Sequence, residues 1–265
     1  MATQFFLVAH ITRMSSGNHL LEDIFMRWHW LLLTFILFPS LSHAEEANSG
    51  FLNKTFTDPD GSKAKYVLYV PPDYKNDKPI PVILFLHGSG ETGTDGLKQA
   101  EVGMAPAIRK NPQHFPCIAI FPQSQKRSWQ ASGNDAKRAI SILEEVEKTY
   151  KVDKKRIYLT GLSMGGYGTW SLATAFPDRW AAIVPVCGGG DPRSASRIKD
   201  IPCWCFHGDA DQAVKVEKSR EMIAALKEAG SNPKYTEYAG VGHNSWDKAY
   251  GTKELYDWLF KQEKK

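Results

Sequence analysis

The protein has 265 residues and a formal net charge of +4. No run of Lys and Arg lies on one predicted face, so the charge argues against nucleic acid or a membrane surface as a partner. The four cysteines do not have the number and spacing of a disulfide framework.

The first 44 residues differ in character from the rest. Residues 26–30 supply a short basic region, 31–38 are almost entirely apolar, and a small-x-small cleavage motif ends at Ala44. This pattern predicts a signal peptide that starts at Met26 and export to the periplasm or medium. The apolar run is shorter than the ~20 residues that span a membrane, although an uncleaved anchor is the alternative. We expect residues 45–265 to form one catalytic domain.

Downstream, strand-like and helix-like segments alternate. Residues 51–70 read as two strands joined by a tight turn at 58–61. The helix expected at 135–150 has Asn134 or Asp135 as a fitting N-cap. The alternation predicts an α/β fold with a mainly parallel sheet, helices on both faces and function at the carboxyl edge. The other strands are expected at 82–87, 117–122, 156–160, 181–187, 202–207 and 234–239, and the other helices near 103–110, up to 175, at 216–229 and at the C-terminus.

The sequence Gly161-Leu162-Ser163-Met164-Gly165 lies between a strand and a helix. In a G-x-S-x-G elbow the turn is so tight that both glycines are needed, and the serine is exposed at the strand end. The following helix directs its N-terminal amides towards a developing oxyanion. Ser163 is therefore a candidate nucleophile, and the alternative is an ordinary turn with an N-capping serine.

A serine nucleophile needs a histidine base that is oriented by a carboxylate. Two histidines follow Ser163, and His207 precedes any plausible acid, which leaves His243 as the base if the order is serine, acid, histidine. Asp209 and Asp211 both follow the strand that ends near His207. Their spacing does not choose between them.

Two further segments carry a resemblance to a known family. His207-Gly208-Asp209-Ala210-Asp211-Gln212-Ala213-Val214 resembles the H-G-x-x-D-x-x-V segment of the carboxylesterase, acyl-thioesterase and prolyl-oligopeptidase-like branches of the α/β-hydrolases. The resemblance implies that Asp211 is the acid and Asp209 a turn residue. It covers about residues 64–260.

The other segment follows the apolar strand that ends at Leu86. His87-Gly88-Ser89-Gly90 resembles the L-H-G-x-G loop of the same families. The resemblance implies that the Ser89 amide joins the Met164 amide in an oxyanion hole, with His87 bracing the loop.

The cysteines fall in predicted core strands, where thiols behave as small hydrophobes. A Cys187–Cys203 disulfide is the alternative. Cys203, Cys205 and His207 share one strand face, but no fourth ligand is spaced for zinc. We therefore expect neither a metal nor a cofactor.

Only about 14 residues, 188–201, separate two strands at the point where related enzymes insert a cap, so we expect an open cleft. Trp129 and Trp246 are candidates for its walls, although Trp246 equally fits helix packing. The sequence predicts a serine hydrolase that cleaves carboxylic esters, small or polysaccharide-linked, through an acyl-enzyme. The alternatives are a prolyl-oligopeptidase-like peptidase and a non-catalytic binding module.

Overall fold

The computed structural model describes residues 49–264, so the predicted signal peptide lies outside the described residues. The described chain belongs to one compact unit, Glu45–Lys265. Among residues 49–264, none of the helices combines the length and the apolar character that crossing a bilayer requires.

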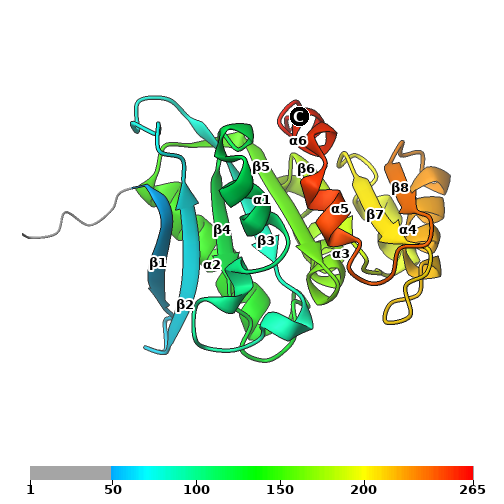
Figure 1. Cartoon of the computed structure of the whole chain (residues 1–265), viewed down its shortest axis with the longest axis horizontal. Helices are drawn as coiled ribbons and strands as arrows, with labels where there is room; N and C mark the ends of the chain where they lie inside the picture. Colours follow the sequence, from blue (N-terminus) through cyan, green and yellow to red (C-terminus); the bar gives the residue numbers. More distant parts are fainter. Residues whose placement is uncertain (1–48, 265) are drawn as a thin grey trace, which may run out of the picture. The chain divides into compact units, whose positions relative to one another are not determined.

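One eight-stranded sheet organises this unit, in the order β1-β2-β4-β3-β5-β6-β7-β8 (Figure 1). β1 and β2 form an antiparallel hairpin, β2 is antiparallel to β4, and the other neighbours are parallel. The predicted α/β class with a mainly parallel sheet is confirmed. The strands are β1 (Gly50–Thr57), β2 (Lys63–Val70), β3 (Ile80–Leu86), β4 (Ile118–Pro122), β5 (Val152–Leu162), β6 (Ala182–Val186), β7 (Trp204–Gly208) and β8 (Lys234–Tyr238).

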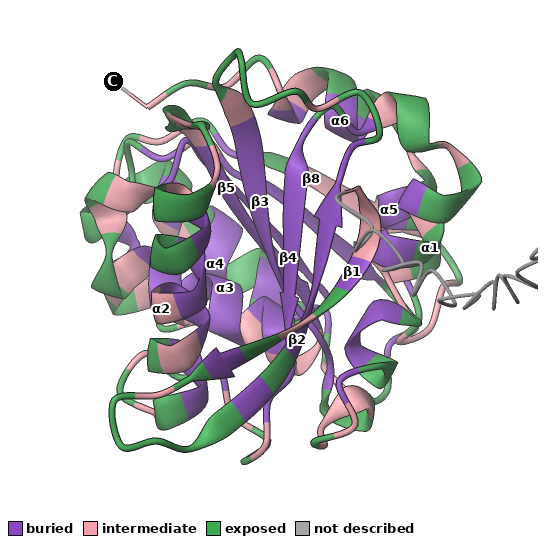
Figure 2. Ribbon diagram, turned by 90° about the vertical axis from the view of Figure 1, so that its left-hand side faces the viewer, coloured by how far each residue is buried: buried purple, intermediate pink, exposed green. Residues whose placement is uncertain are grey.

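Helices cover both faces of the sheet (Figure 2). α2, α3 and α4 contribute to one buried apolar cluster, and α1, α5 and α6 contribute to a second cluster on the opposite face. β3 and β4 are buried along almost their whole length because both of their faces are covered. The helices are α1 (Met104–Lys110), α2 (Asn134–Thr149), α3 (Met164–Ala175), α4 (Glu217–Glu228), α5 (Trp246–Gly251) and α6 (Lys253–Leu259).

The sequence predicted one C-terminal helix, but the structure has two helices there, α5 and α6. Thr252 has an extended backbone, with φ −84° and ψ 113°, and it separates α5 from α6. The apolar residues Tyr250 and Leu255 on either side of the break are both buried in the same cluster. The bend therefore lets both segments keep their apolar faces on the sheet.

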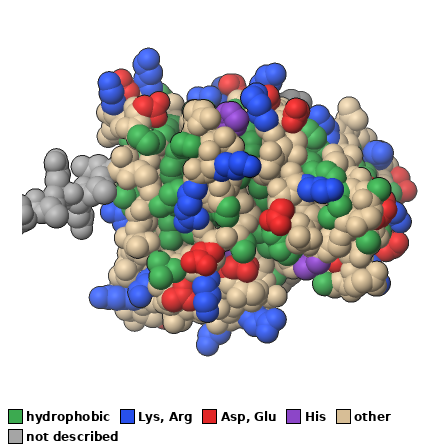
Figure 3. Space-filling view, viewed as in Figure 1, with side chains coloured by type: hydrophobic (Ala, Val, Ile, Leu, Met, Phe, Trp, Pro, Cys, Tyr) green, Lys and Arg blue, Asp and Glu red, His purple; other side chains and the backbone are tan. Residues whose placement is uncertain are grey.

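The described cysteines are all buried with free thiols. The alternative disulfide between Cys187 and Cys203 is therefore not formed. On the face shown in Figure 3, basic and acidic side chains of the described residues are interspersed.

The elbow between β5 and α3 is tightly packed against the end of β3. Ser163 has φ 53° and ψ −115°, a conformation that is rare for a residue with a side chain. A Cβ atom on Gly165 would lie 1.9 Å from the carbonyl oxygen of Leu86, and one on Gly161 would lie 2.4 Å from that of Gly165. Glycine at both positions is thus required by backbone contacts, as the motif predicts.

Gly165→Ala should destabilise the protein by more than about 3 kcal/mol, because its Cβ would overlap backbone atoms that cannot move independently. The matched control is Gly251→Ala in α5, where an added Cβ meets no atom within 4 Å and should change stability by less than about 1 kcal/mol. Urea unfolding measures both. Equal effects would show that the close packing of the elbow does not exist.

Candidate active site

Hydrogen bonds connect Ser163 to His243 and His243 to Asp211. Nε2 of His243 is 2.9 Å from Oγ of Ser163, and Nδ1 of His243 is 2.6 Å from Oδ2 of Asp211. An ionised carboxylate only accepts hydrogen bonds, so Nδ1 carries the proton and Nε2 is free to accept the serine hydroxyl. The structure thus brings together the three residues that the sequence singled out.

Three strand ends at one edge of the sheet supply these side chains. Ser163 follows β5, Asp211 follows β7 and His243 lies on the loop after β8. That loop is held by Asp209, whose Oδ1 accepts a 2.7 Å hydrogen bond from the amide of Gly240. Asp209 therefore positions the histidine loop, and only Asp211 contacts the imidazole.

The Asp211 carboxylate is buried and saturated with donors. Its Oδ1 accepts hydrogen bonds from the amides of Ala213 and Val214, at 2.8 and 2.9 Å. Burial opposes ionisation of the carboxyl, but the hydrogen bond from His243 and those from the amides outweigh it and lower the pKa of Asp211. The acid is therefore held as a carboxylate beside the base.

His207 is a supporting residue that the sequence analysis did not assign. Its buried ring has Nε2 3.2 Å from Oδ2 of Asp211 and 2.9 Å from the carbonyl oxygen of Val214, and Nδ1 2.7 Å from Oγ of Ser219. The ring fixes the loop that presents Asp211. The four-residue spacing in the H-G-x-x-D segment was the available signal.

The candidate oxyanion loop passes close to the nucleophile. A Cβ on Gly88 would lie 3.6 Å from Cβ of Ser163, which places the start of the loop beside the elbow. Ser89 begins a 3-10 turn (Ser89–Glu91) and Met164 begins α3. The first amides of a helix have no carbonyl within that helix to pair with, so both amides are available as donors.

His87 braces this loop from inside the protein. Its Nδ1 donates to the carbonyl oxygen of Gly88, and its Nε2 accepts a 2.8 Å hydrogen bond from the amide of Ser124. Burial lowers the pKa of His87 to about 4, so the ring is neutral, as this pattern of one donor and one acceptor requires.

The two candidate pocket tryptophans differ in position. Trp129 is only 2% exposed, and its Nε1 donates a 2.9 Å hydrogen bond to the carbonyl oxygen of His87. Its indole also packs edge-on against the His87 ring, so the prediction that Trp129 walls an open cleft is wrong, and the residue supports the oxyanion loop. Trp246 is half-buried and lies edge-on to His243, with ring centroids 5.3 Å apart.

Asp135 is not part of the N-cap of α2. The N-cap is Gly133, and no side chain bonds to the helix amides there. The buried Asp135 carboxylate instead accepts hydrogen bonds from the Ser124 hydroxyl and from the amides of Gln125 and Lys126, at 2.7 to 2.9 Å. It folds the loop after β4 whose Ser124 amide holds His87.

Among the described residues, one cluster has the geometry of a metal site. Ligand atoms of Cys187, Asp211 and His243 all lie within 4.8 Å of one another. Two of the three residues belong to the hydrogen-bonded sequence above, so the cluster overlaps the candidate active site.

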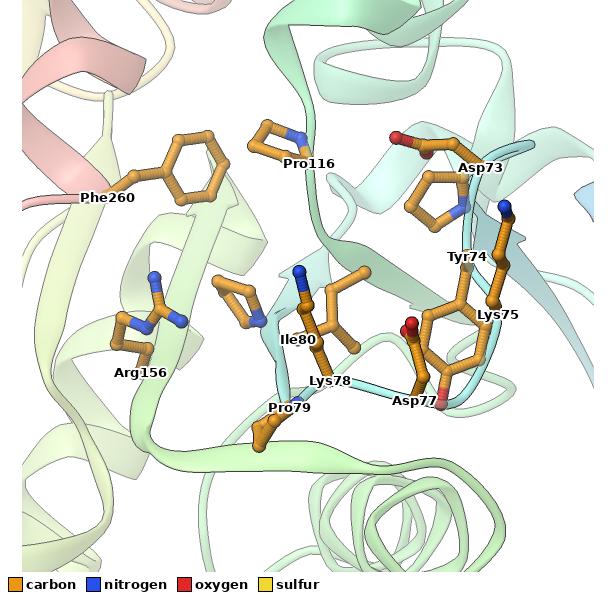
Figure 4. Close-up of a pocket in the computed structure, with 12 residues that line it drawn as sticks. Asp73, Tyr74, Lys75, Asp77, Lys78, Pro79, Ile80, Pro116, Arg156 and Phe260 are labelled. Carbon is orange, nitrogen blue, oxygen red and sulfur yellow. The ribbon is translucent and has the colours of Figure 1, made fainter.

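One cavity, of about 550 Å³, is lined by none of these residues; Figure 4 shows the side chains that line it. It is lined by Ile80 at the start of β3, by Pro116 before β4 and by Arg156 in the first half of β5, at the amino edge of the sheet. A second cavity of about 470 Å³ includes Tyr167, one helical turn after Ser163. Only the second cavity is close to the candidate active site.

Comparisons with known proteins point in one direction. A family model described as BD-FAE matches residues 67–175. A probable feruloyl esterase C of Aspergillus niger is 24% identical over 219 residues, which are 80% of this chain and 81% of that protein. A bifunctional acetylxylan esterase/xylanase of Neocallimastix patriciarum is 25% identical over 149 residues, 52% of this chain and 20% of that protein.

Solved structures agree. The crystal structure of a thermostable esterase is 38% identical with a TM-score of 0.75, and the match covers 80% of this chain and 63% of that one. This chain therefore spans a fifth of the bifunctional protein and less than two thirds of the thermostable esterase.

The sheet order, with serine, aspartate and histidine at the ends of β5, β7 and β8, is that of the α/β-hydrolase fold, which the thermostable esterase shares. Its sequence relatives include proteins named as feruloyl esterases, and the 38% identical structure is that of an esterase.

The neutral state of His87 predicts a pH-dependent loss of stability. A pKa of about 4 in the folded protein is below the ~6.5 of an unfolded histidine, so the unfolded chain binds the extra proton as the pH falls. The contribution is complete above pH ~6.5 and is lost towards pH 4. Between pH 7 and pH 5 the parent should lose about 2 kcal/mol more than His87→Asn.

Urea unfolding at both pH values measures this difference. His114→Asn, at a partly exposed position, is the matched control and should keep the parental pH dependence. Identical losses in the parent and in His87→Asn would contradict the bracing role of a neutral His87.

Proposed function

We propose that this protein hydrolyses carboxylic esters through an acyl-enzyme on Ser163, with His243 as general base and acid and with Asp211 as its orienting carboxylate. The observation that carries the proposal is the pair of hydrogen bonds that His243 makes to Ser163 and Asp211, at 2.9 and 2.6 Å. Nδ1 donates to Asp211 and Nε2 accepts from the Ser163 hydroxyl, which is the arrangement that proton transfer from serine requires.

The proposed chemistry has two halves. Oγ of Ser163 attacks the ester carbonyl carbon while Nε2 of His243 takes the hydroxyl proton. The tetrahedral intermediate collapses, the alcohol leaves with that proton, and the acyl group stays on Ser163. Water then attacks the acyl-enzyme, again deprotonated by His243, and the carboxylic acid is released when Ser163 recovers its proton.

Charge develops at two points along this path. The imidazolium formed on His243 lies against Asp211, whose lowered pKa keeps it ionised. The oxyanion would be held by the amides of Ser89 and Met164, and the latter begins α3, so the positive end of the helix dipole faces the same position.

We infer that the substrates are esters attached to polysaccharides. Ser163 and Met164 are partly exposed and the imidazole of His243 is 27% exposed, so a bulky alcohol group has access to the serine. Between β6 and β7 the described chain inserts only a short 3-10 helix, Pro192–Arg197. The feruloyl and acetylxylan esterases among the relatives point to the same substrate class.

The signal peptide predicted at residues 26–44 supports a further part of the proposal, that the enzyme is exported and acts as a single catalytic domain from about residue 45 onwards. Export fits a polysaccharide substrate that lies outside the cell. An uncharacterised secreted protein of Arthroderma benhamiae, 27% identical over 206 residues, is among the relatives.

Ser163→Ala should lower kcat for p-nitrophenyl acetate by about a thousandfold or more and leave the unfolding free energy nearly unchanged, because only the nucleophilic oxygen is lost. Activity near that of the parent would contradict the mechanism.

The parent should not cleave peptide p-nitroanilides. Efficient cleavage of these amides would favour a peptidase, and a parent inactive on all esters would favour a binding module.

Asp211→Asn should lower kcat by roughly a thousandfold, because an amide favours the wrong imidazole tautomer and cannot stabilise the imidazolium. Asp209→Asn is the matched control, since its amide oxygen can still accept the Gly240 hydrogen bond. It should lower kcat by less than about tenfold. The reverse order of effects would assign the orienting role to Asp209.

A further inference from the structure

A groove of about 470 Å³ lies along the nucleophile helix, and the reaction proposed above does not use it. Its volume is within the ~300–1,000 Å³ range of small-molecule sites. Three parts of the chain form it. They are the outer side of α3, the segment after β6 that contains Gly189 and Gly190 together with the 3-10 helix that follows it, and Gln130 from the loop before α2. The lining residues are Gln130, Tyr167, Trp170, Ser171, Thr174, Gly189, Gly190, Asp191, Ser194 and Arg197.

One end of the groove is next to the candidate active site. Tyr167 is one helical turn after Ser163, and its amide donates a 3.1 Å hydrogen bond to the Ser163 carbonyl oxygen. A Cβ on Gly189 would lie 3.0 Å from Cε1 of Tyr167, so the segment that contains Gly189 packs closely against that side chain. From there the groove follows α3 to Thr174, away from the carboxyl edge.

The lining carries exchangeable hydroxyl and amide groups. The Ser171 hydroxyl donates to Gln130 at 3.1 Å, and the Thr174 hydroxyl donates to Ser194 at 3.2 Å. These side chains are partly exposed or exposed, so a ligand hydroxyl can replace either partner. A long alkyl chain has no donor or acceptor that could exchange with these groups, so the lining offers it no specific contact.

The lining carries few charges. Asp191 is paired with Arg193, and the other charged residue of the lining is Arg197. Most of the polar groups that face a ligand in this groove are therefore neutral, which favours a ligand with hydroxyl groups over a highly charged one.

We propose that this groove binds the saccharide part of the ester substrate, with successive sugar hydroxyls contacting Tyr167, Ser171 and Thr174 along α3. This inference rests on the proposed ester hydrolysis at Ser163. It assigns the groove to the alcohol side of the ester and leaves the acyl group on the other side of the nucleophile.

The test compares two substrates that share an acyl group: p-nitrophenyl acetate and an acetylated xylo-oligosaccharide. Ser171→Trp places an indole in the groove, and Ser196→Trp places the same side chain at an exposed position of the adjacent 3-10 helix outside the lining. Ser171→Trp should lower kcat/KM for the oligosaccharide by about tenfold, mainly through KM. Its turnover of p-nitrophenyl acetate should stay within about twofold, and Ser196→Trp should change neither.

A second pair of changes keeps the inference testable if Ser171→Trp does not fold. The double variant Thr174→Val and Arg197→Ala removes two groups at the far end of the groove, and it should raise KM only for the oligosaccharide. Equal effects on both substrates, or no effect on the oligosaccharide, would overturn the saccharide site while leaving the esterase intact. A parent enzyme that turns over neither substrate would contradict the proposed function itself.

Discussion

The site depends on one close approach, that of the first turn of α3 to the carboxyl end of β3. Gly165 packs so closely on the Leu86 carbonyl that no side chain fits between them. Gly88, two residues further along the chain from Leu86, lies against Ser163. This contact sets the distance between Ser163 and the loop that carries the Ser89 amide. The left-handed backbone of Ser163, with φ 53°, is the local strain that accompanies it.

A chain of buried and partly buried polar groups supports the loop on the other side of that contact. Arg138 links Asp58 in the β1–β2 turn to Asp135, and Asp135 folds the loop whose Ser124 amide bonds to His87. Because burial keeps His87 neutral, its two ring nitrogens have opposite roles, one for each loop. These groups therefore position the loop that carries the Ser89 amide.

Hydrophobic patterns and glycine spacing predicted most of the strands and the elbow, because each is a local property of the chain. The choice of Asp211 over Asp209 as the acid came from the resemblance of residues 207–214 to a known family. The roles of Trp129, Asp135 and His207 were not predictable in the same way. Each depends on a partner that another part of the chain supplies: the His87 carbonyl for Trp129, the amides of the loop after β4 for Asp135, and Ser219 of α4 for His207. The break at Thr252 likewise follows from packing on the sheet.

The central claim is that the hydroxyl of Ser163 is the activated nucleophile. The most direct measurement is peptide mapping by mass spectrometry after the folded protein reacts with a fluorophosphonate, in which the serine oxygen bonds to phosphorus and fluoride leaves. The account predicts one adduct, on the peptide containing Ser163. An adduct on another residue, or no labelling of the folded protein, would contradict it.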